Sequence, residues 1–170
     1  GSIAGFENQH NLMSETFRNV RTKLQFMLEN GRNVILVTST ISGEGKSFVS
    51  SNLAISLSLL GKKVVIVGLD IRKPGLNKVF NLSRKEQGIT QFLTNPAVNL
   101  MDLVQPSDIN RNLFVLPGGA VPPNPTELLA RDGLEQAIET LKEIFDYVIL
   151  DTAPVGLVTE TLLNGCNADL

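Results

Sequence analysis

The chain has 170 residues, of which 42% are hydrophobic, and a formal net charge of −2 from 15 basic and 17 acidic residues. This length and composition fit one domain with a sizeable core, and the near-neutral balance argues against a basic surface for nucleic acid or membrane. The sequence has one cysteine, which leaves no internal disulfide, and no apolar run long enough to span a membrane.

The N-terminal part predicts a leader and a helix. Residues 1–12 have the polar character of a leader, and the apolar spacing that follows predicts a helix over residues 14–30. Glu15, Arg18 and Arg21 lie three residues apart along that helix. The spacing by itself favours a solvated helix face with a local ion pair.

A glycine-rich loop lies between a predicted strand and a predicted helix. Val34–Val37 is a short apolar run typical of a buried strand, and an apolar-periodic segment follows Lys46 and Ser47 up to Leu60. Strand, glycine loop, Lys-Ser and helix is the layout of a phosphate-binding P-loop. Glycines let successive backbone N–H groups face one concavity, and the helix N-terminus adds unpaired N–H groups with a partial positive charge.

The residue types at the end of this loop suit a nucleotide. Lys46 supplies a full positive charge near the β- and γ-phosphates, and the Ser47 hydroxyl is a ligand for magnesium. The strict pattern has Gly or Ala where Thr40 stands. The alternative is a surface turn with a helix-capping serine, but the intact Gly-x-Gly-Lys-Ser core favours the phosphate site.

Two further predicted strands, at residues 63–70 and 147–151, each end in an aspartate, Asp70 and Asp151 respectively. Strand, helix and strand over this length imply a right-handed crossover and a parallel sheet, whose ligands bind beyond the carboxyl ends of the strands. Asp151 is expected to hold magnesium through water. Asp70 is expected to coordinate magnesium or to accept a proton, and its alternative role is in a turn or a helix cap.

The remaining elements complete an α/β fold of the P-loop NTPase type, with a mostly parallel sheet flanked by helices. The domain is predicted to cover residues 13–170, and we expect the natural protein to continue beyond Leu170 with at least one more strand. Patterns of apolar residues predict helices at 89–93, 100–104, 134–145 and 158–164, a strand at 113–116, and a further helix capped by Thr126.

Together these motifs resemble the bacterial tyrosine kinases, the BY-kinase family, which is related to the ParA/MinD class of P-loop ATPases. The resemblance covers about residues 13–170. Residues 38–47 are similar to the family's Walker A motif, residues 65–74 to its Walker A′ and residues 145–154 to its Walker B. The run Pro-Pro-Asn-Pro-Thr-Glu-Leu-Leu at 122–129 is also similar to a family stretch.

The resemblance implies a set of site residues. Catalysis is assigned to Lys46, Asp70 and Asp151, and magnesium binding to Ser47, Asp70 and Asp151. Glu15, Arg18 and Arg21 match the family's Glu-x-x-Arg-x-x-Arg oligomerisation motif, which reverses the preference that spacing gave them. The ATP phosphates are assigned to Ser42, Gly43, Glu44, Gly45, Lys46, Ser47 and Phe48.

The resemblance also implies a function. Family members are the cytoplasmic kinase modules of exopolysaccharide chain-length and export systems, with ATP and Mg²⁺ as cofactors. They phosphorylate a tyrosine-rich C-terminal tail of a neighbour in a homo-oligomeric ring, and the cytoplasmic end of a transmembrane partner, fused or separate, activates them. The expected location is the cytoplasmic face of the bacterial inner membrane, with no nucleic-acid partner.

The chain departs from the family pattern at Gly68, where the family usually has the first Asp of an Asp-x-Asp pair, and at Ser42, where it usually has Pro. Gly68 removes a candidate general base and leaves Asp70 for that role. Ile41 stands where ParA/MinD-type ATPases have a signature lysine, which favours the kinase. The alternatives are a ParA/MinD-like ATPase switch and a catalytically weak ATP-binding assembly module, in which Gly68 marks lost catalysis.

Overall fold

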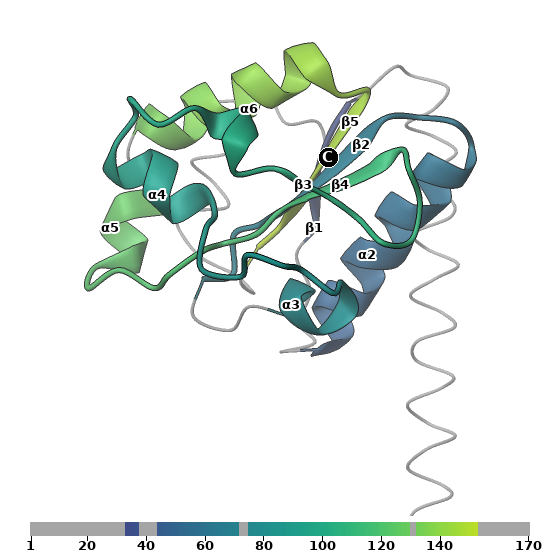
Figure 1. Ribbon diagram of the computed structural model, residues 1–170, viewed down its shortest axis with the longest axis horizontal. Helices are drawn as coiled ribbons and strands as arrows, with labels where there is room; N and C mark the ends of the chain where they lie inside the picture. The colour runs from purple at the N-terminus through teal and green to yellow at the C-terminus, as the bar shows by residue number, and fades with distance from the viewer. Residues whose placement is uncertain (1–32, 38–43, 72–74, 130–131, 153–170) are drawn as a thin grey trace, which may run out of the picture. The chain divides into compact units, whose positions relative to one another are not determined.

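The computed structural model describes residues 33–37, 44–71, 75–129 and 132–152. A single five-stranded sheet lies at the centre of this part, in the order β1-β5-β2-β4-β3 (Figure 1). The four longer strands run parallel, and β3 pairs antiparallel with β4. The predicted, mostly parallel α/β fold is confirmed. The strands are β1 (Val34–Val37), β2 (Val64–Gly68), β3 (Gln105–Pro106), β4 (Leu113–Leu116) and β5 (Tyr147–Asp151).

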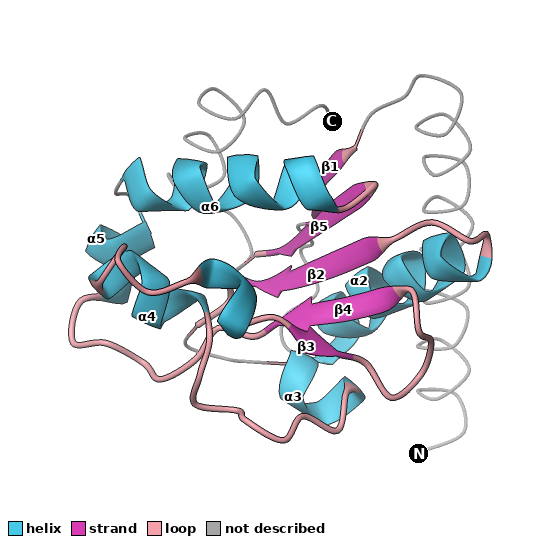
Figure 2. Ribbon diagram, turned by 45° about the horizontal axis from the view of Figure 1, so that its top comes forward, coloured by secondary structure: helices cyan, strands magenta, loops and turns pink. Residues whose placement is uncertain are grey.

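Helices cover both faces of the sheet, and α6 and α2 lie on opposite sides of it (Figure 2). The central strands are therefore buried on both faces, which explains why they are continuous apolar runs without a polar alternation. Residues of β2 and β5, from Val64 and Tyr147 onward, contact α2 directly. The helices are α2 (Glu44–Leu59), α3 (Leu76–Val79), α4 (Ile89–Thr94), α5 (Pro125–Leu129) and α6 (Asp132–Ile144), with a 3₁₀ turn η1 at Leu100–Asp102.

The main core lies between the sheet and the helices α4 and α6. Alternate residues of the central strands, among them Val65 and Val67, pack there against Ile138 and Leu141 of α6, and all four are 0% exposed. Burying such side chains is the largest favourable contribution to folding, at about 1.5–3 kcal/mol each. The core therefore holds β2 and β5 rigidly, and these two strands carry the ends at which the site is built.

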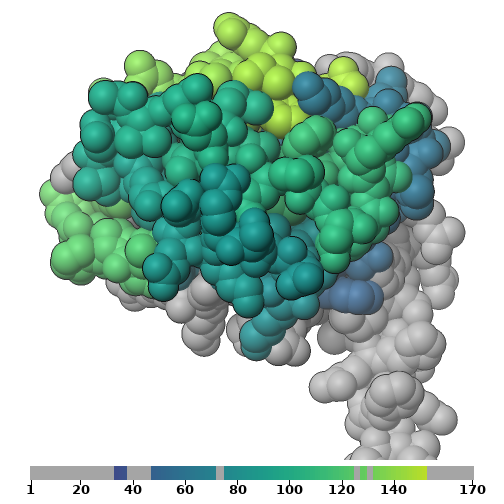
Figure 3. All heavy atoms as spheres, viewed as in Figure 1, coloured from purple at the N-terminus to yellow at the C-terminus, as the bar shows by residue number. Residues whose placement is uncertain are grey.

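The segment between β2 and β4 is the part that the sequence described least well. Its residues, coloured teal to green, form most of the face seen in Figure 3. The segment is held by buried side chains such as Phe80, Ile89 and Leu100, which are between 0% and 4% exposed. It also contains the two-residue strand β3, which is too short to produce a periodic signal.

Several predicted boundaries need correction. Helix α2 begins at Glu44, two residues before Lys46, and β2 ends at Gly68, so Asp70 follows the strand instead of ending it. The predicted helix at 100–104 is the three-residue turn η1, where the Asn99 side chain accepts a hydrogen bond from the Met101 N–H. Thr126 does not cap α5, because the helix begins one residue earlier, at Pro125.

The other predicted elements in the described part of the chain are present with small shifts: α6 covers Asp132–Ile144 instead of 134–145, α2 ends at Leu59 instead of Leu60, and β2 begins at Val64 instead of residue 63. Strands β1, β4 and β5 have the predicted bounds, and α4 extends the predicted helix by one residue, to Thr94. The positive φ of +84° at Gly61 follows α2, as expected for a glycine that ends a helix. Within the described ranges, no helix combines the length and the hydropathy that crossing a bilayer requires.

Candidate functional site

Asp151 occupies the centre of the candidate site. It is the last residue of β5, which lies between β1 and β2 in the sheet. In register, Asp151 is opposite Val37 on one side and Gly68 on the other. The carboxylate is therefore placed between the strand that leads into the P-loop segment and the strand that leads to Asp70.

Two serines of α2 hold the Asp151 carboxylate. Ser47 Oγ donates to Asp151 Oδ2 at 3.0 Å, and Ser50 Oγ donates to Asp151 Oδ1 at 2.8 Å. All three residues are buried, with exposures of 1% for Ser47 and Asp151 and 0% for Ser50. Hydrogen bonds to a carboxylate offset part of the cost of burying its charge. The structure thus brings together Ser47 and Asp151, the two residues predicted to share a magnesium ion.

Asp70 is placed at the same edge by the backbone. The N–H groups of Leu69 and Asp70 both donate to the Asp151 carbonyl oxygen, at 2.8 and 3.1 Å. The chain that leaves β2 is thereby tied to the end of β5, and Asp70 is 7% exposed. The predicted carboxylates therefore belong to one sheet edge, as expected for parallel strands.

Part of the predicted phosphate site lies in the first turn of α2. The backbone of Glu44, Gly45 and Lys46 opens this helix, where N–H groups have no partner within the helix. Phe48 follows and is 41% exposed, in contrast to the buried Ser47 before it.

Several predictions fall outside the described residues. These are the roles of Ser42 and Gly43 in the P-loop, the helix with Glu15, Arg18 and Arg21, the leader, and the helix predicted at 158–164.

Two glycines allow close packing around the site. A Cβ at Gly68 would lie 3.1 Å from the Gly118 nitrogen and 3.2 Å from Leu76 Cδ1, so the end of β2 fits closely against its neighbours. A Cβ at Gly75 would lie 2.7 Å from Ser47 Cβ and closer still to its Oγ. Gly75 precedes α3, so the start of this helix packs directly against the side chain that reaches Asp151.

Sequence reasoning missed Ser50 and Gly75. The three-residue spacing between Ser47 and Ser50 places both on one helix face, and this signal was available before the structure. The contact between Gly75 and Ser47 had no such signal, because Ser47 lies in the first turn of α2 and Gly75 lies in the loop between β2 and α3.

The donor set suits Mg²⁺ together with a nucleotide. The described residues contain no group of three or more His, Cys, Asp and Glu side chains arranged to hold a metal by themselves. Mg²⁺ usually takes one or two carboxylates and completes its shell with water and substrate phosphates. Asp151, the Ser47 hydroxyl and nearby Asp70 fit that requirement, since a serine oxygen keeps lone pairs for a cation while its proton donates to Asp151.

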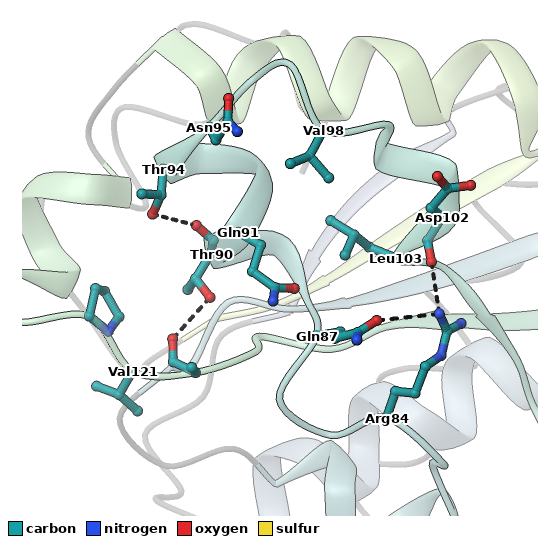
Figure 4. A pocket seen from close by; sticks show the side chains of 12 residues that line it. Arg84, Gln87, Thr90, Gln91, Thr94, Asn95, Val98, Asp102, Leu103 and Val121 are labelled. Carbon is teal, nitrogen blue, oxygen red and sulfur yellow. Dashed lines mark hydrogen bonds between the residues drawn. The ribbon is translucent and has the colours of Figure 1, made fainter.

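A separate cavity of about 610 Å³ lies beside α4 (Figure 4). It is lined by residues of α4 and η1 and by the loop at 120–122, and none of the predicted ATP or magnesium residues lines it. Its wall is held by hydrogen bonds, including Thr90 Oγ1 to the Ala120 carbonyl at 2.9 Å and Arg84 Nη1 to the Asp102 carbonyl at 3.2 Å. The Asp151 site and this cavity are distinct features.

Comparison with known proteins identifies the family. The AAA domain family model matches residues 32–168. The tyrosine-protein kinase YwqD of Bacillus subtilis is 34% identical over 169 residues, which are 99% of this chain and 70% of that protein. The chain belongs to the bacterial tyrosine-kinase family.

Two further relatives agree. The tyrosine-protein kinase CpsD of Streptococcus agalactiae serotype III is 37% identical over 155 residues, which are 90% of this chain and 66% of that protein, so the chain spans just under two thirds of its length. The kinase domain of the Escherichia coli tyrosine kinase ETK superposes with a TM-score of 0.75 at 31% identity, over 88% of this chain and 58% of that one. The fold is thus similar to that of a solved tyrosine-kinase domain.

Replacing Gly75 by alanine tests the close packing at Ser47. The Gly75 backbone, with φ −74° and ψ −23°, is one that alanine adopts without strain, so a loss of stability reports the collision with Ser47. We expect the free energy of unfolding, measured with urea, to fall by about 1–3 kcal/mol. Asn77→Ala, on the same short helix, is the control and is expected to change stability by less than about 0.5 kcal/mol. Equal stability of Gly75→Ala and wild type would contradict the packing.

Proposed function

We propose that this chain is the catalytic domain of an ATP-dependent protein-tyrosine kinase, which transfers the γ-phosphoryl group of ATP to a tyrosine hydroxyl. The observation that carries the proposal is the buried hydrogen bond between Ser47 and Asp151, 3.0 Å long, in a chain of the tyrosine-kinase family. It joins the first turn of the P-loop helix to the carboxylate at the end of β5, which is the pairing that P-loop enzymes use at the metal.

In this proposal the chain supplies charge and positioning. Lys46 and the backbone N–H groups of residues 42–48 bind the phosphates, and Ser47 and Asp151 hold Mg²⁺, with Asp70 as a further ligand. Held by Ser47 and Asp151, a bound Mg²⁺ would supply positive charge that offsets the negative charge of the phosphates. Phosphoryl transfer needs little covalent chemistry from the protein, so these contacts account for most of the expected catalysis.

Asp70 is the residue proposed to accept the tyrosine proton. A tyrosine hydroxyl with a pKa of about 10 is almost fully protonated at neutral pH, so a nearby carboxylate assists its attack. Asp70 lies at the same edge as Asp151, to which its backbone is bonded. Gly68, at the end of β2, has no carboxylate. Of positions 68 and 70, only Asp70 can therefore accept the proton.

The acceptor tyrosine comes from outside the described fold. Tyr147 is the only tyrosine in the sequence, and it lies at the start of β5, at the opposite end of the strand from Asp151. It is 7% exposed, and burial, followed by the neighbouring charge of Asp146, raises its pKa above 10.0. A buried, protonated tyrosine at that position is a packing residue, so the proposed acceptor is the tyrosine-rich tail of a neighbouring subunit.

The family resemblance extends the proposal to assembly and location. The chain is proposed to form a homo-oligomeric ring through Glu15, Arg18 and Arg21, at the cytoplasmic face of the bacterial inner membrane. A transmembrane polysaccharide co-polymerase, fused or separate, is the proposed activator, and exopolysaccharide synthesis and export the process that it regulates.

One observation favours a second candidate. Gly68 carries no carboxylate, and its surroundings are tight enough that a Cβ would lie 3.1 Å from the Gly118 nitrogen. A chain that keeps the nucleotide site but has lost this group fits an ATP-binding assembly module with weak catalysis.

Lys46→Ala tests the kinase assignment. The native-length protein, with the cytoplasmic segment of its membrane partner and a synthetic tyrosine-rich peptide, is incubated with γ-labelled Mg-ATP. We expect label on peptide tyrosine, and a loss of about 100-fold or more in Lys46→Ala, because the charge that stabilises the transferring phosphoryl group is gone. Lys62→Ala, beyond the far end of α2, is the matched charge control. Free phosphate without labelled peptide would favour an ATPase switch, and bound ATP without either product would favour the assembly module.

Gly68→Asp and Gly68→Asn together separate charge from size at this position. Both side chains press on Gly118 and Leu76 to the same extent, and only the aspartate offers a carboxylate. We expect tyrosine phosphorylation to be at least about 10-fold faster in Gly68→Asp than in Gly68→Asn, in keeping with the effect of a positioned base. Equal rates in the two variants would show that position 68 contributes no proton transfer.

Arg18→Ala combined with Arg21→Ala tests the proposed ring. Removal of two cations from the Glu-x-x-Arg-x-x-Arg motif is expected to lower the oligomeric state, because Glu15 and its counterparts lose their partners across subunits. Light scattering of the native-length protein gives the mass directly. Lys62→Ala with Lys85→Ala removes the same charge elsewhere and is expected to leave the mass unchanged. An unaltered mass in the arginine variant would count against the role of the motif.

A further inference from the structure

We infer that Ser50 is a positioning residue for magnesium, which acts by fixing the orientation of the Asp151 carboxylate. This inference rests on the proposed nucleotide site, in which Asp151 and Ser47 hold the ion. Ser50 belongs to none of the phosphate-loop positions, and it lies one helical turn beyond them on α2. It is 0% exposed, and its hydroxyl donates to Asp151 Oδ1 at 2.8 Å.

The two serines bond to different oxygens of the Asp151 carboxylate. Residues three apart on a helix lie on the same face, so Ser47 and Ser50 approach Asp151 from one side. Ser47 donates to Oδ2 and Ser50 to Oδ1, so the two hydroxyls bond to different oxygens of the carboxylate. The terminal torsion of an aspartate is otherwise broad and roughly two-fold, so these paired bonds set an angle that the side chain does not set by itself.

The two hydroxyls have different functions. Ser47 lies in the first turn of α2, where its oxygen has lone pairs left for a cation while its O–H donates to Asp151. Ser50 lies one turn further along α2, beyond the phosphate-loop positions, and its hydroxyl donates to Asp151 Oδ1, so it acts through Asp151. It is comparable to the partners that orient metal ligands from behind, whose loss commonly lowers metal affinity 10- to 100-fold.

The position of Asp151 depends on other contacts. Its backbone carbonyl accepts from the N–H groups of Leu69 and Asp70, and its strand pairs on both sides. Removing the Ser50 hydroxyl leaves these contacts in place. The expected result is a carboxylate in the right place but with a less defined orientation, and thus weaker magnesium binding without a loss of nucleotide binding.

The experiment measures binding, so it does not depend on catalysis. A fluorescent ADP analogue is titrated into the native-length protein in EDTA, and Mg²⁺ is then titrated at fixed nucleotide. For Ser50→Ala we expect the Mg²⁺ concentration at half-saturation to rise about 10-fold, while the nucleotide affinity in EDTA stays within about twofold. Ser50→Cys keeps the size with a weak donor and is expected to shift in the same direction, which provides a second test if the alanine variant is unstable.

Ser58→Ala is the matched control. Ser58 lies on the same helix and is 1% exposed, but its hydroxyl donates to the helix itself, at the Ile55 carbonyl, 2.7 Å away. It is expected to change neither titration. A wild-type protein whose nucleotide binding ignores Mg²⁺ would overturn the proposed function and this inference together. If wild type depends on Mg²⁺ and both Ser50 variants show the same dependence, the inference alone is overturned. It is also overturned if the variants lose as much nucleotide affinity in EDTA as they lose with Mg²⁺.

Discussion

The buried Asp151 carboxylate is the constraint on which the rest of this site depends. A carboxylate that is 1% exposed is stable only with strong donors, and the structure provides two hydroxyls from one helix. These bonds require the first turns of α2 to lie against the end of β5. That requirement fixes where the P-loop helix begins in space, and hence where phosphates can be bound.

The strands determine a different property of the same residue. Because β5 lies between β1 and β2, Asp151 at its end is opposite Val37 on one side and Gly68 on the other. The Asp70 N–H donates a hydrogen bond to the Asp151 carbonyl. The sheet is covered on both faces, so this placement is rigid. The sheet thus determines the position of the carboxylate, and α2 determines its orientation.

The sequence could predict the parts of this arrangement that are local. Apolar runs ending in an aspartate gave β5 with its bounds, and a glycine loop before a helix gave α2 to within two residues at its start. The bond between Ser50 and Asp151 joins residues 101 apart, and it depends on β5 being inserted between β1 and β2. No local pattern contains that strand order. The spacing could place Ser50 on the helix face of Ser47, but its bond to Asp151 and the contact of Gly75 required the fold.

Gly68 changes the electrostatics of the edge as well as its shape. Carboxylates gathered at one sheet edge repel each other and the phosphates of ATP, and each becomes acceptable only when a cation or a donor faces it. With glycine at position 68, opposite Asp151 in register, the edge has one negative charge fewer than the family pattern. In the proposed kinase, less positive charge from magnesium would be needed for balance, and one group fewer would be able to accept a proton. In the proposed kinase, the residue at position 68 would therefore affect nucleotide binding and catalysis in opposite directions, while Ser47 and Asp151 would still hold the metal.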